Sequence, residues 1–598
     1  MLVFLLTACA PDGDAPSERR LRESPGEDTA GTDSDDPDSD VPESTNPDSG
    51  LADTSLAPIT PRLAPVDCGS VSFGDASVER AIWIDAAANP SGDGSEASPF
   101  QSLAEGLAQA GEIDAAWIES GTYPGNLEIV ASGITLYGRG PHSTVLSASP
   151  GSPNLVIAAG DSGSIGLCQL AATGGSFGVV VESGGVSIEA AELRGATRAG
   201  LVVNGVGRWA WLDGSSITGT VAEADVGSGI SVGDGASLEL SGTTVADNDG
   251  IGILASGTGT VLDVRDSTVD RNGGGVATAF AGGIVIVNAV VATLERVTLS
   301  QNVFSGIDVS GEGPEVHASD LVVAGTRAHQ ELAAGLRFHS GDVTVSNSQV
   351  RGGDGFGLVA FTGAYDLLDV HVTGVARRRD GAGGIGACLE VNSATTIERL
   401  VATENEVAGL AAWEGVTCTD CLLADNGVVG AYVGFGQLVL DATTVRDNGA
   451  AGIAAVPERW AQVELNDALV GPHPYAGIWL SGQRSWLYVD NSVLQGGAGF
   501  VAEGSQHDGF AVWGWHAPTT LEDSVVEGAE QVGVYLGESG LKLSGNAWNN
   551  SGLDLVMTKS TDAEKTRGLD EVPESDINSD NPPTYTALTL DDYELECR

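Results

Sequence analysis

The chain is poor in basic residues. Only 27 of its 598 residues are Lys or Arg, against 82 Asp or Glu, and the formal net charge is -55. Lysine occurs three times, at Lys542, Lys559 and Lys565. Nucleic acids and anionic lipids would be repelled by such a charge, which excludes electrostatic binding to either. An acidic polysaccharide would need a bridging cation such as Ca²⁺. We expect no other cofactor.

Cysteine is also scarce, with seven in the chain. If Cys9 is lipidated, six remain, and an exported chain could join them in three disulfides whose pairing the spacing does not determine. Cys418 and Cys421 resemble half of a zinc knuckle. Without a second pair a zinc site is disfavoured, and we expect core thiols or a bond from one of them to Cys388. We predict no metal site.

Glycine, in contrast, is abundant, at 84 residues, and most of it belongs to a repeat. Residues 229–248, GISVGDGASLELSGTTVADN, begin with Gly, alternate apolar and polar positions, and end at Asn. Residues 430–448 follow the same plan. Alternation with a period of two indicates strands, and copies every 21 to 32 residues indicate a solenoid of stacked parallel strands. The starting glycines are Gly178, Gly200, Gly229, Gly252, Gly283, Gly306, Gly335, Gly357, Gly384, Gly409, Gly430, Gly452, Gly477, Gly509 and Gly533.

Asparagine recurs four residues before the next starting glycine, at Asn248, Asn302, Asn405, Asn426 and Asn448. We expect it to occupy a turn position with positive φ. Stacked copies could also bond to one another along the axis, as side-chain ladders do in other parallel stacks.

The repeat pattern G-[IL]-x-[VL]…L-x-[LV]-x-x-[ST]-x-[VL]-x-x-N resembles that of the right-handed parallel β-helix proteins of the pectate-lyase-like superfamily. The resemblance covers most of the chain and implies an all-β, right-handed parallel β-helix. It implies little about activity, because that fold carries lyases, hydrolases, epimerases, phage spikes and non-catalytic surface proteins.

The ends of the chain differ from the repeat. Residues 1–9, MLVFLLTAC, resemble a bacterial lipobox with Cys9 as the lipidated residue, although the basic start of a signal peptide is missing. Residues 10–66 form an acidic linker too polar to fold, which we expect to be a disordered tether. Residues 67–150 are expected to form an N-terminal cap and the first coils, with a helix that begins at Ser98. Residues 151–552 are the β-helix body, and residues 553–598 a capping tail.

Long repeats place their extra residues between the Asn turn and the next Gly, so the inserts share one edge of the solenoid. We expect a ligand site on this edge. His473, His507 and Asp508 could form an acid–base set there, with Asp380 as a further catalytic candidate. Arg377, Arg378 and Arg379 could bind an acidic sugar, or could be a solvated turn paired with carboxylates. Other polar residues of the edge are Glu223, Asp225, His329 and Glu331.

Tryptophans supply a separate hypothesis. Trp479, Trp486, Trp513 and Trp515 lie close in sequence and would be platforms for sugar rings if exposed, or core residues if buried. Trp209 and Trp211 are a similar pair, on one side of a strand.

The sequence favours a non-catalytic, lipid-anchored outer-membrane or cell-surface protein, otherwise periplasmic or secreted, that binds glycans or a surface partner along the insert edge. A polysaccharide lyase or glycoside hydrolase acting at that edge is the alternative, and a structural or adhesive stalk is another. The Asp-pair motifs of pectin hydrolases and the Arg-Pro-x-x-Arg run of pectate lyases are missing, which weighs against an enzyme. We expect a monomer whose partners are polysaccharide or a cell-surface protein, not nucleic acid, with membrane attachment only through the lipid.

Overall fold

The computed structural model describes Cys68, residues 73–75, 78, 80–109, 113–222, 227–275, 281–328, 333–391, 395–455, 460–482, 484–497, 500–502, 505–507, 510–529, 532–537, 539–549, 553–557, 577–578 and Leu595. Cys9, Glu223, Asp225, His329, Glu331 and Asp508 lie outside these residues. Among the described residues no helix has both the length and the apolar character needed to span a membrane.

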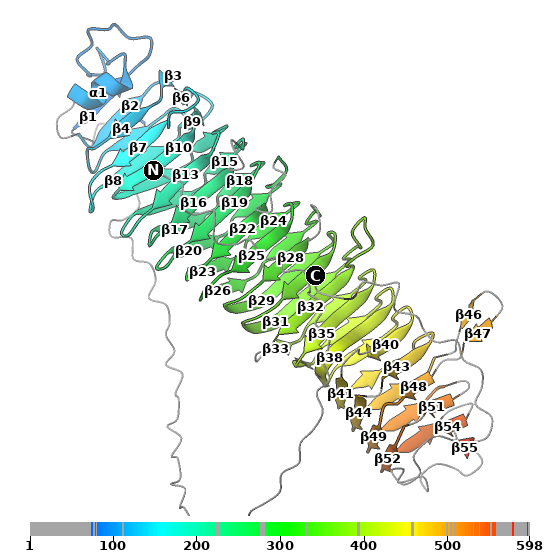
Figure 1. Cartoon of the computed structure of the whole chain (residues 1–598). Coiled ribbons are helices and arrows are strands. Elements are labelled where there is room, and N and C mark those ends of the chain that lie inside the picture. The colour runs from blue at the N-terminus through cyan, green and yellow to red at the C-terminus, as the bar shows by residue number, and fades with distance from the viewer. Residues whose placement is uncertain are drawn as a thin grey trace, which may run out of the picture. The chain divides into compact units, whose positions relative to one another are not determined.

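Repeated coils of three strands build the fold, and strands of successive coils pair in parallel (Figure 1). One coil consists of β16 (Ser228–Gly233), β17 (Ser237–Ser241) and β18 (Thr244–Ala246). Corresponding strands of all coils form three stacks, which we name first, second and third in that order. The predicted parallel β-helix is therefore confirmed.

The first stack contains β4 (Leu127–Ile129), β7 (Leu155–Ala158), β10 (Phe177–Ser183), β13 (Ala199–Asn204), β16, β19 (Ile251–Ser256), β22 (Gly282–Val287), β25 (Ser305–Ser310), β28 (Ala334–Phe338), β30 (Phe356–Ala360), β32 (Ile385–Val391), β35 (Ala408–Glu414), the start of β38 (Val429–Asp441), β40 (Ala451–Ala455), β43 (Ala476–Ser481), β48 (Phe510–Trp515), β51 (Val532–Gly537), β54 (Leu553–Met557) and β55 (Ile577–Asn578). Because β54 and β55 pair in parallel with the stack, the repeat continues past the predicted end at residue 552.

The second stack contains β1 (Ala81–Ile84), β2 (Ala115–Ile118), β5 (Thr135–Tyr137), β8 (Ser164–Cys168), β11 (Gly185–Glu189), β14 (Trp209–Asp213), β17, β20 (Val261–Arg265), β23 (Val291–Glu295), β26 (Glu315–Ser319), the starts of β29 (Asp342–Arg351) and β31 (Ala364–Thr373), β33 (Thr395–Glu398), β36 (Val416–Thr419), the end of β38, β41 (Ala461–Asn466), β44 (Ser485–Asp490), β49 (Thr519–Glu522) and β52 (Leu541–Ser544).

The third stack contains β3 (Gly121–Pro124), β6 (Thr144–Ala148), β9 (Ala171–Gly174), β12 (Glu192–Arg194), β15 (Ser216–Thr218), β18, β21 (Thr268–Asp270), β24 (Thr298–Ser300), β27 (Val322–Ala324), the ends of β29 and β31, β34 (Val401–Thr403), β37 (Leu422–Ala424), β39 (Thr444–Arg446), β42 (Leu469–Val470), β45 (Val493–Gln495), β50 (Val525–Glu527) and β53 (Ala547–Asn549). Outside the stacks, β46 (Phe500–Ala502) and β47 (Ser505–His507) form an antiparallel hairpin.

One apolar core runs through the coils. In β17, Leu238 and Leu240 point inward and are buried, whereas Ser237, Glu239 and Ser241 point outward. Neighbouring coils place residues of the same kind in register: Leu238 pairs with Leu262 and Leu240 with Val264. The alternation seen in the sequence thus becomes continuous inward columns.

A column of glycines marks the start of the first stack. A methyl group on Gly252 would lie 2.6 Å from the carbonyl oxygen of Gly283 and 2.8 Å from Asn272 Nδ2, so no side chain fits there. The same contact to the next glycine recurs along the column. Two predicted members need correction. Gly386, not Gly384, faces Gly409, and Ala511 lies opposite Gly477 in place of Gly509, which is outside the described residues.

Asparagines line the corner between the third and first stacks. Asn248 donates from its backbone N (3.2 Å) and Nδ2 (2.9 Å) to Asn272 Oδ1, and Asn272 repeats both bonds to Asn302. A second run joins Asn405, Asn426 and Asn448. The predicted ladder is confirmed and includes Asn272, which the spacing did not reveal. The predicted positive φ is wrong: it belongs to the preceding residues, such as Asp247 and Asp425.

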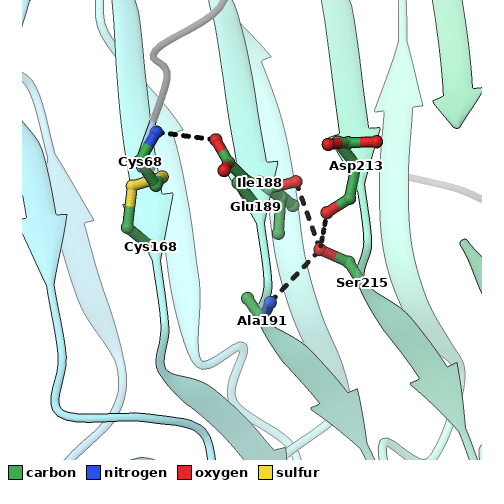
Figure 2. Close-up of a disulfide and its surroundings, with 7 residues drawn as sticks. All are labelled: Cys68, Cys168, Ile188, Glu189, Ala191, Asp213 and Ser215. Carbon is green, nitrogen blue, oxygen red and sulfur yellow. Dashed lines mark hydrogen bonds between the residues drawn. A yellow bond between two sulfur atoms is a disulfide. The ribbon is translucent and has the colours of Figure 1, made fainter. Parts of the chain in front are cut away.

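A short helix covers the N-terminal coil. It is α1 (Leu103–Gln109), and Ser102 Oγ accepts the N–H of Glu105, so the cap is Ser102 and not Ser98. Phe100 and Leu103 are buried against the first coil. The N-terminal segment is also fixed by a disulfide between Cys68 and Cys168, and the Cys68 N–H donates to Glu189 Oε2 at 2.7 Å (Figure 2).

The other described disulfide joins Cys418 and Cys421. Cys418 lies in β36, and Asp420, with φ of 54°, turns the chain so that Cys421 also enters the core. Both residues therefore lie in the core, as expected, but they are bonded to each other, which corrects the expectation of free thiols or of a bond from this pair to Cys388. Among the described residues, no group of three or more His, Cys, Asp or Glu side chains is arranged to hold a metal ion.

Candidate functional site

The strands that flank each insert confirm that the inserts share one edge, because each insert connects a third-stack strand to the next first-stack strand. The inserts are at residues 220–225, 325–331, 374–380, 471–475 and 496–508. The arginine run lies in one of them. Arg377 Nε is 2.8 Å from Glu406 Oε1, and its backbone N–H donates to Oε2 of the same carboxylate. These bonds hold the pKa of Glu406 below its usual range.

The rest of this insert is bonded within itself. Arg378 is buried, and its Nη2 lies 3.0 Å from Asp380 Oδ2. The pKa of Asp380 is lowered, first by the N–H of Ala382 and then by Arg378. Arg379 is exposed. Two of the three arginines thus pair with carboxylates of the protein, which agrees with a structured turn better than with a binding cluster.

His473 is not a surface residue. It is 1 % exposed and continues the asparagine ladder: the backbone N–H of Asn448 donates to His473 Nδ1 at 3.2 Å. Burial lowers its pKa to about 4. The imidazole is therefore neutral near pH 7, and its Nδ1 already accepts a hydrogen bond from Asn448. This corrects the prediction that His473 is a surface acid–base residue. His507 belongs to the hairpin strand β47, which lies outside the three stacks.

The four tryptophans of the predicted platform do not lie together. Trp479 and Trp513 are buried on the outer side of the first stack, with ring centroids 5.8 Å apart, and Trp513 stacks on Tyr535. Trp515 packs against the same group. Trp486 lies elsewhere, on the outer side of the second stack. Burial removes Trp479 and Trp513 as platforms for sugars.

The outer side of the second stack, which we name the polar face, carries the exposed aromatic residues. Trp460 and Trp486 are 41 % and 43 % exposed, and no other Trp, Tyr or Phe side chain whose burial the structure describes is as exposed. Trp486 of β44 pairs in register with Gln462 of β41, and Trp460 lies directly before β41, two residues ahead of Gln462, so both exposed indoles belong to the same part of the polar face. Sequence alone pointed to Trp486 but not to Trp460, because exposure is not visible in an alternating pattern.

Polar groups surround these indoles. Glu464 accepts from Gln437 Nε2 at 3.1 Å and from Asn466 Nδ2 at 3.4 Å. Tyr488, in register with Glu464, donates its hydroxyl to Glu522 at 3.1 Å. We name Trp460, Gln462, Glu464, Trp486 and Tyr488 the Trp486 patch. It combines flat apolar rings with amide, hydroxyl and carboxylate groups that can bond to hydroxyls of a ligand.

A second aromatic group lies further toward the N-terminus on the same face. Trp209 and Trp211 point outward from β14 and are half-buried. A methyl group on Gly185 would be 2.0 Å from the Trp209 ring, so that glycine makes room for the indole. The two groups are separated by eleven successive parallel pairings, about 53 Å at the usual strand spacing.

Two carboxylates adjoin Trp211. Glu239 is its register partner on β17, and Asp263 is the partner of Glu239 on β20. Asp263 Oδ2 is 2.6 Å from Arg265, whereas its buried Oδ1 has no hydrogen-bond partner. Burial raises the pKa of both carboxyls, and Asp263 adds to the rise at Glu239. We name Trp209, Trp211, Glu239, Asp263 and Arg265 the Trp209 patch.

Comparisons with known proteins place the chain by fold. Residues 155–323 match the family model described as "Right handed beta helix region". None of the curated proteins compared with the chain matches it in sequence.

Solved structures of similar fold include three carbohydrate-active proteins. Pectate lyase Pel9A is 16 % identical with a TM-score of 0.33, over 55 % of this chain and 80 % of its own. The catalytic unit of an α-1,3-glucanase from Streptomyces thermodiastaticus is 16 % identical with a TM-score of 0.26, over 67 % and 68 %. The periplasmic alginate epimerase AlgG is 14 % identical with a TM-score of 0.30, over 61 % and 82 %. At such values the likeness concerns the fold alone.

Proposed function

We propose that the chain binds a neutral polysaccharide along the polar face without cleaving it. The observation that carries the proposal is the pair of exposed indoles, Trp486 on β44 and Trp460 directly before β41, beside the polar side chains of the Trp486 patch. An exposed indole has an unfavourable contact with water that a sugar ring's apolar face removes. The neighbouring amides, hydroxyls and carboxylates then bond to the ring hydroxyls.

Charge selects the class of polysaccharide. Outward carboxylates recur along the polar face, at Glu189, Asp213, Glu239, Asp263, Glu295, Asp366, Glu398, Asp441, Glu464, Asp490 and Glu522. With the formal charge of -55, they repel a polyuronate. A neutral glucan, mannan or galactan carries no such penalty. The proposed binding surface is therefore the polar face and not the insert edge.

Binding of the purified chain to a panel of neutral and acidic polysaccharides tests the proposal. We expect retention by a neutral polymer and at least a tenfold loss of affinity in Trp460→Ala/Trp486→Ala. Leu469→Ala, which removes an exposed apolar side chain of the third stack, is the control and should bind like the wild type. Equal binding by the double variant, or binding of polyuronates alone, contradicts the proposal.

A second candidate function is glycoside hydrolysis at the Trp209 patch. It is favoured by Glu239 and Asp263, which occupy adjacent strands about 4.8 Å apart and hold their protons to higher pH than ordinary carboxyls. A retaining glycosidase needs two carboxyls about 5 Å apart, one of them protonated. The test is the release of reducing ends from polysaccharides. Hydrolysis at the Trp209 patch is established if this release stops in Glu239→Gln and Asp263→Asn but continues in Glu315→Gln, which changes a carboxylate elsewhere on the same face.

We also propose that Cys9 anchors the protein to a membrane at the cell surface, as the lipobox-like start suggests. Mass analysis of the mature N-terminus tests this directly. A diacylglyceryl group on Cys9 is expected, and an unmodified Met1 would contradict it.

A further inference from the structure

The outer side of the first stack changes along the molecule. In early coils its middle column holds Val180, Val202 and Leu254, which are only partly buried. From β30 onward the same column is apolar and fully buried: Val359, Cys388, Ala411, Tyr432, Ala454, Trp479, Trp513, Tyr535 and Val556. Since these side chains point away from the core, another part of the protein must cover them. We name this column and its neighbours the covered stripe.

Leu595 identifies the covering segment. Of the described residues in the covered stripe's cluster, it alone lies outside the coils, and it is 5 % exposed. Its carbonyl oxygen accepts a hydrogen bond from Trp413 Nε1 at 3.3 Å. Residues separated by 182 positions in the chain are therefore in contact.

Cysteine pairing points to the same segment. Cys388, in the middle of the column, is disulfide-bonded. The other four described cysteines pair with each other, as Cys68–Cys168 and Cys418–Cys421. Cys9 and Cys597 remain as partners, and Cys597 is two residues after Leu595. In an extended segment Tyr593, Leu595 and Cys597 share one side, while Glu594 and Glu596 point the other way.

We infer that the residues after Asn578 return along the outer side of the first stack, cover the stripe and are fixed by a Cys388–Cys597 disulfide. The path from β55 back to β35 spans seven strand spacings, about 34 Å. The residues between Asn578 and Leu595 reach roughly 55 Å when extended, so the length suffices. The capping tail thus lies along the side of the coils and does more than close their end.

The N-terminal segment is also held on the outer side of a stack by aromatic packing and a disulfide, in this case on the second stack. Phe73 packs against Trp83 and Trp117 on the outer side of the second stack, and Cys68–Cys168 fixes the segment there. In both places a disulfide and an aromatic cluster secure a segment to the outer side of the coils.

Disulfide mapping of the full chain under non-reducing conditions tests the inference. A disulfide-linked pair of peptides that contain Cys388 and Cys597 is expected. The measurement uses the wild-type chain, so it does not depend on whether a variant folds. A pair of Cys388 with Cys9, or a free thiol at Cys597, would overturn it.

Two variants test the covering itself. Removal of residues 579–598, which leaves β55 in place, should expose Tyr432, Trp479, Trp513 and Tyr535, with a several-fold rise in the fluorescence of a dye that binds apolar surfaces. Cys597→Ser should give a smaller rise. Cys418→Ala/Cys421→Ala removes a different disulfide and should leave the dye signal unchanged. An unchanged signal in the truncated monomer would show that the segment does not cover the stripe. If the full-length protein forms a dimer and binds the dye as a monomer but not as a dimer, a second copy of the chain covers the stripe, and the inference is wrong.

Discussion

At the corner between the third and first stacks, two adjacent residues have separate roles. Asp247, Asp425 and Asp447 adopt positive φ and turn the chain, and the asparagine that follows each of them bonds to the next coil. An asparagine side chain can do this because it offers one acceptor and two donors at the ends of a short arm. The Asp-Asn pair in the sequence is thus a turn residue followed by a ladder residue.

His473 makes this corner sensitive to pH. Its pKa is lowered from about 6.5 to about 4 by burial. Below pH 6.5 the unfolded chain binds a proton that the folded protein does not accept, so stability falls as the pH drops from 6.5 to 4, by roughly 3 kcal/mol for this group.

His473→Asn should remove that loss and keep the acceptor for Asn448. The difference in melting temperature between the variant and the wild type, measured across this pH range, checks the prediction. His339, whose pKa burial also lowers to about 4, contributes equally to both proteins and cancels in the comparison. A constant difference at all pH values would contradict it.

Gly252→Ala tests the glycine column. The new methyl group would meet two fixed groups, the Gly283 carbonyl and the Asn272 amide, and we expect a loss of about 3 kcal/mol or more because neither neighbour can move aside. Gly415→Ala is the control, since no atom lies within 4 Å of the position that its methyl group would take. Thermal unfolding of both variants provides the measurement, and similar melting temperatures would show that the column tolerates side chains.

These residues also show what the sequence could reveal. Glycine and asparagine recur at fixed spacing, so the coils and the ladder were predictable. The sequence analysis chose Gly384 instead of Gly386 as a column glycine because both fit the spacing. Only the contact of Gly386 with the carbonyl oxygen of Gly409 identifies the correct one. The exposure of the tryptophans could not be predicted from the sequence, for a different reason. Alternation shows that Trp513 and Trp515 share a side, but whether that side meets solvent depends on contacts such as that of Leu595, far away in the chain.

At the scale of elements, the disulfides differ in what they close. Cys68–Cys168 closes 100 residues, and Cys418–Cys421 closes a single turn. In the chain-entropy account the long loop contributes about 4–5 kcal/mol and the short one much less.

Cys68→Ala/Cys168→Ala should therefore release the N-terminal segment, with early proteolysis before β1 and a lower melting temperature. Cys418→Ala/Cys421→Ala should cause a smaller change, confined to the coils around β36. Limited proteolysis with mass analysis of the fragments distinguishes the two. Equal damage from both double variants would contradict the prediction.

The whole molecule is dominated by negative charge. Binding of a neutral polysaccharide by indoles and hydrogen bonds should change little between low and high salt, because no ion pairs form. A polyuronate should bind only when salt or Ca²⁺ screens the polar face. Retention on immobilised neutral and acidic polymers, measured over a salt series, checks both expectations. Strong salt weakening of the neutral interaction would indicate a charged ligand and a different site.

Because most coils start at a column glycine and their strands pair with those of the coils beside them, the gene can change length in whole units. Duplication of residues 229–251 would insert one more coil with its core, corner and glycine contact already correct. Lineages of this protein should then differ by integral numbers of coils between the two disulfide-secured ends, so that evolution adjusts reach while the terminal attachments stay constant.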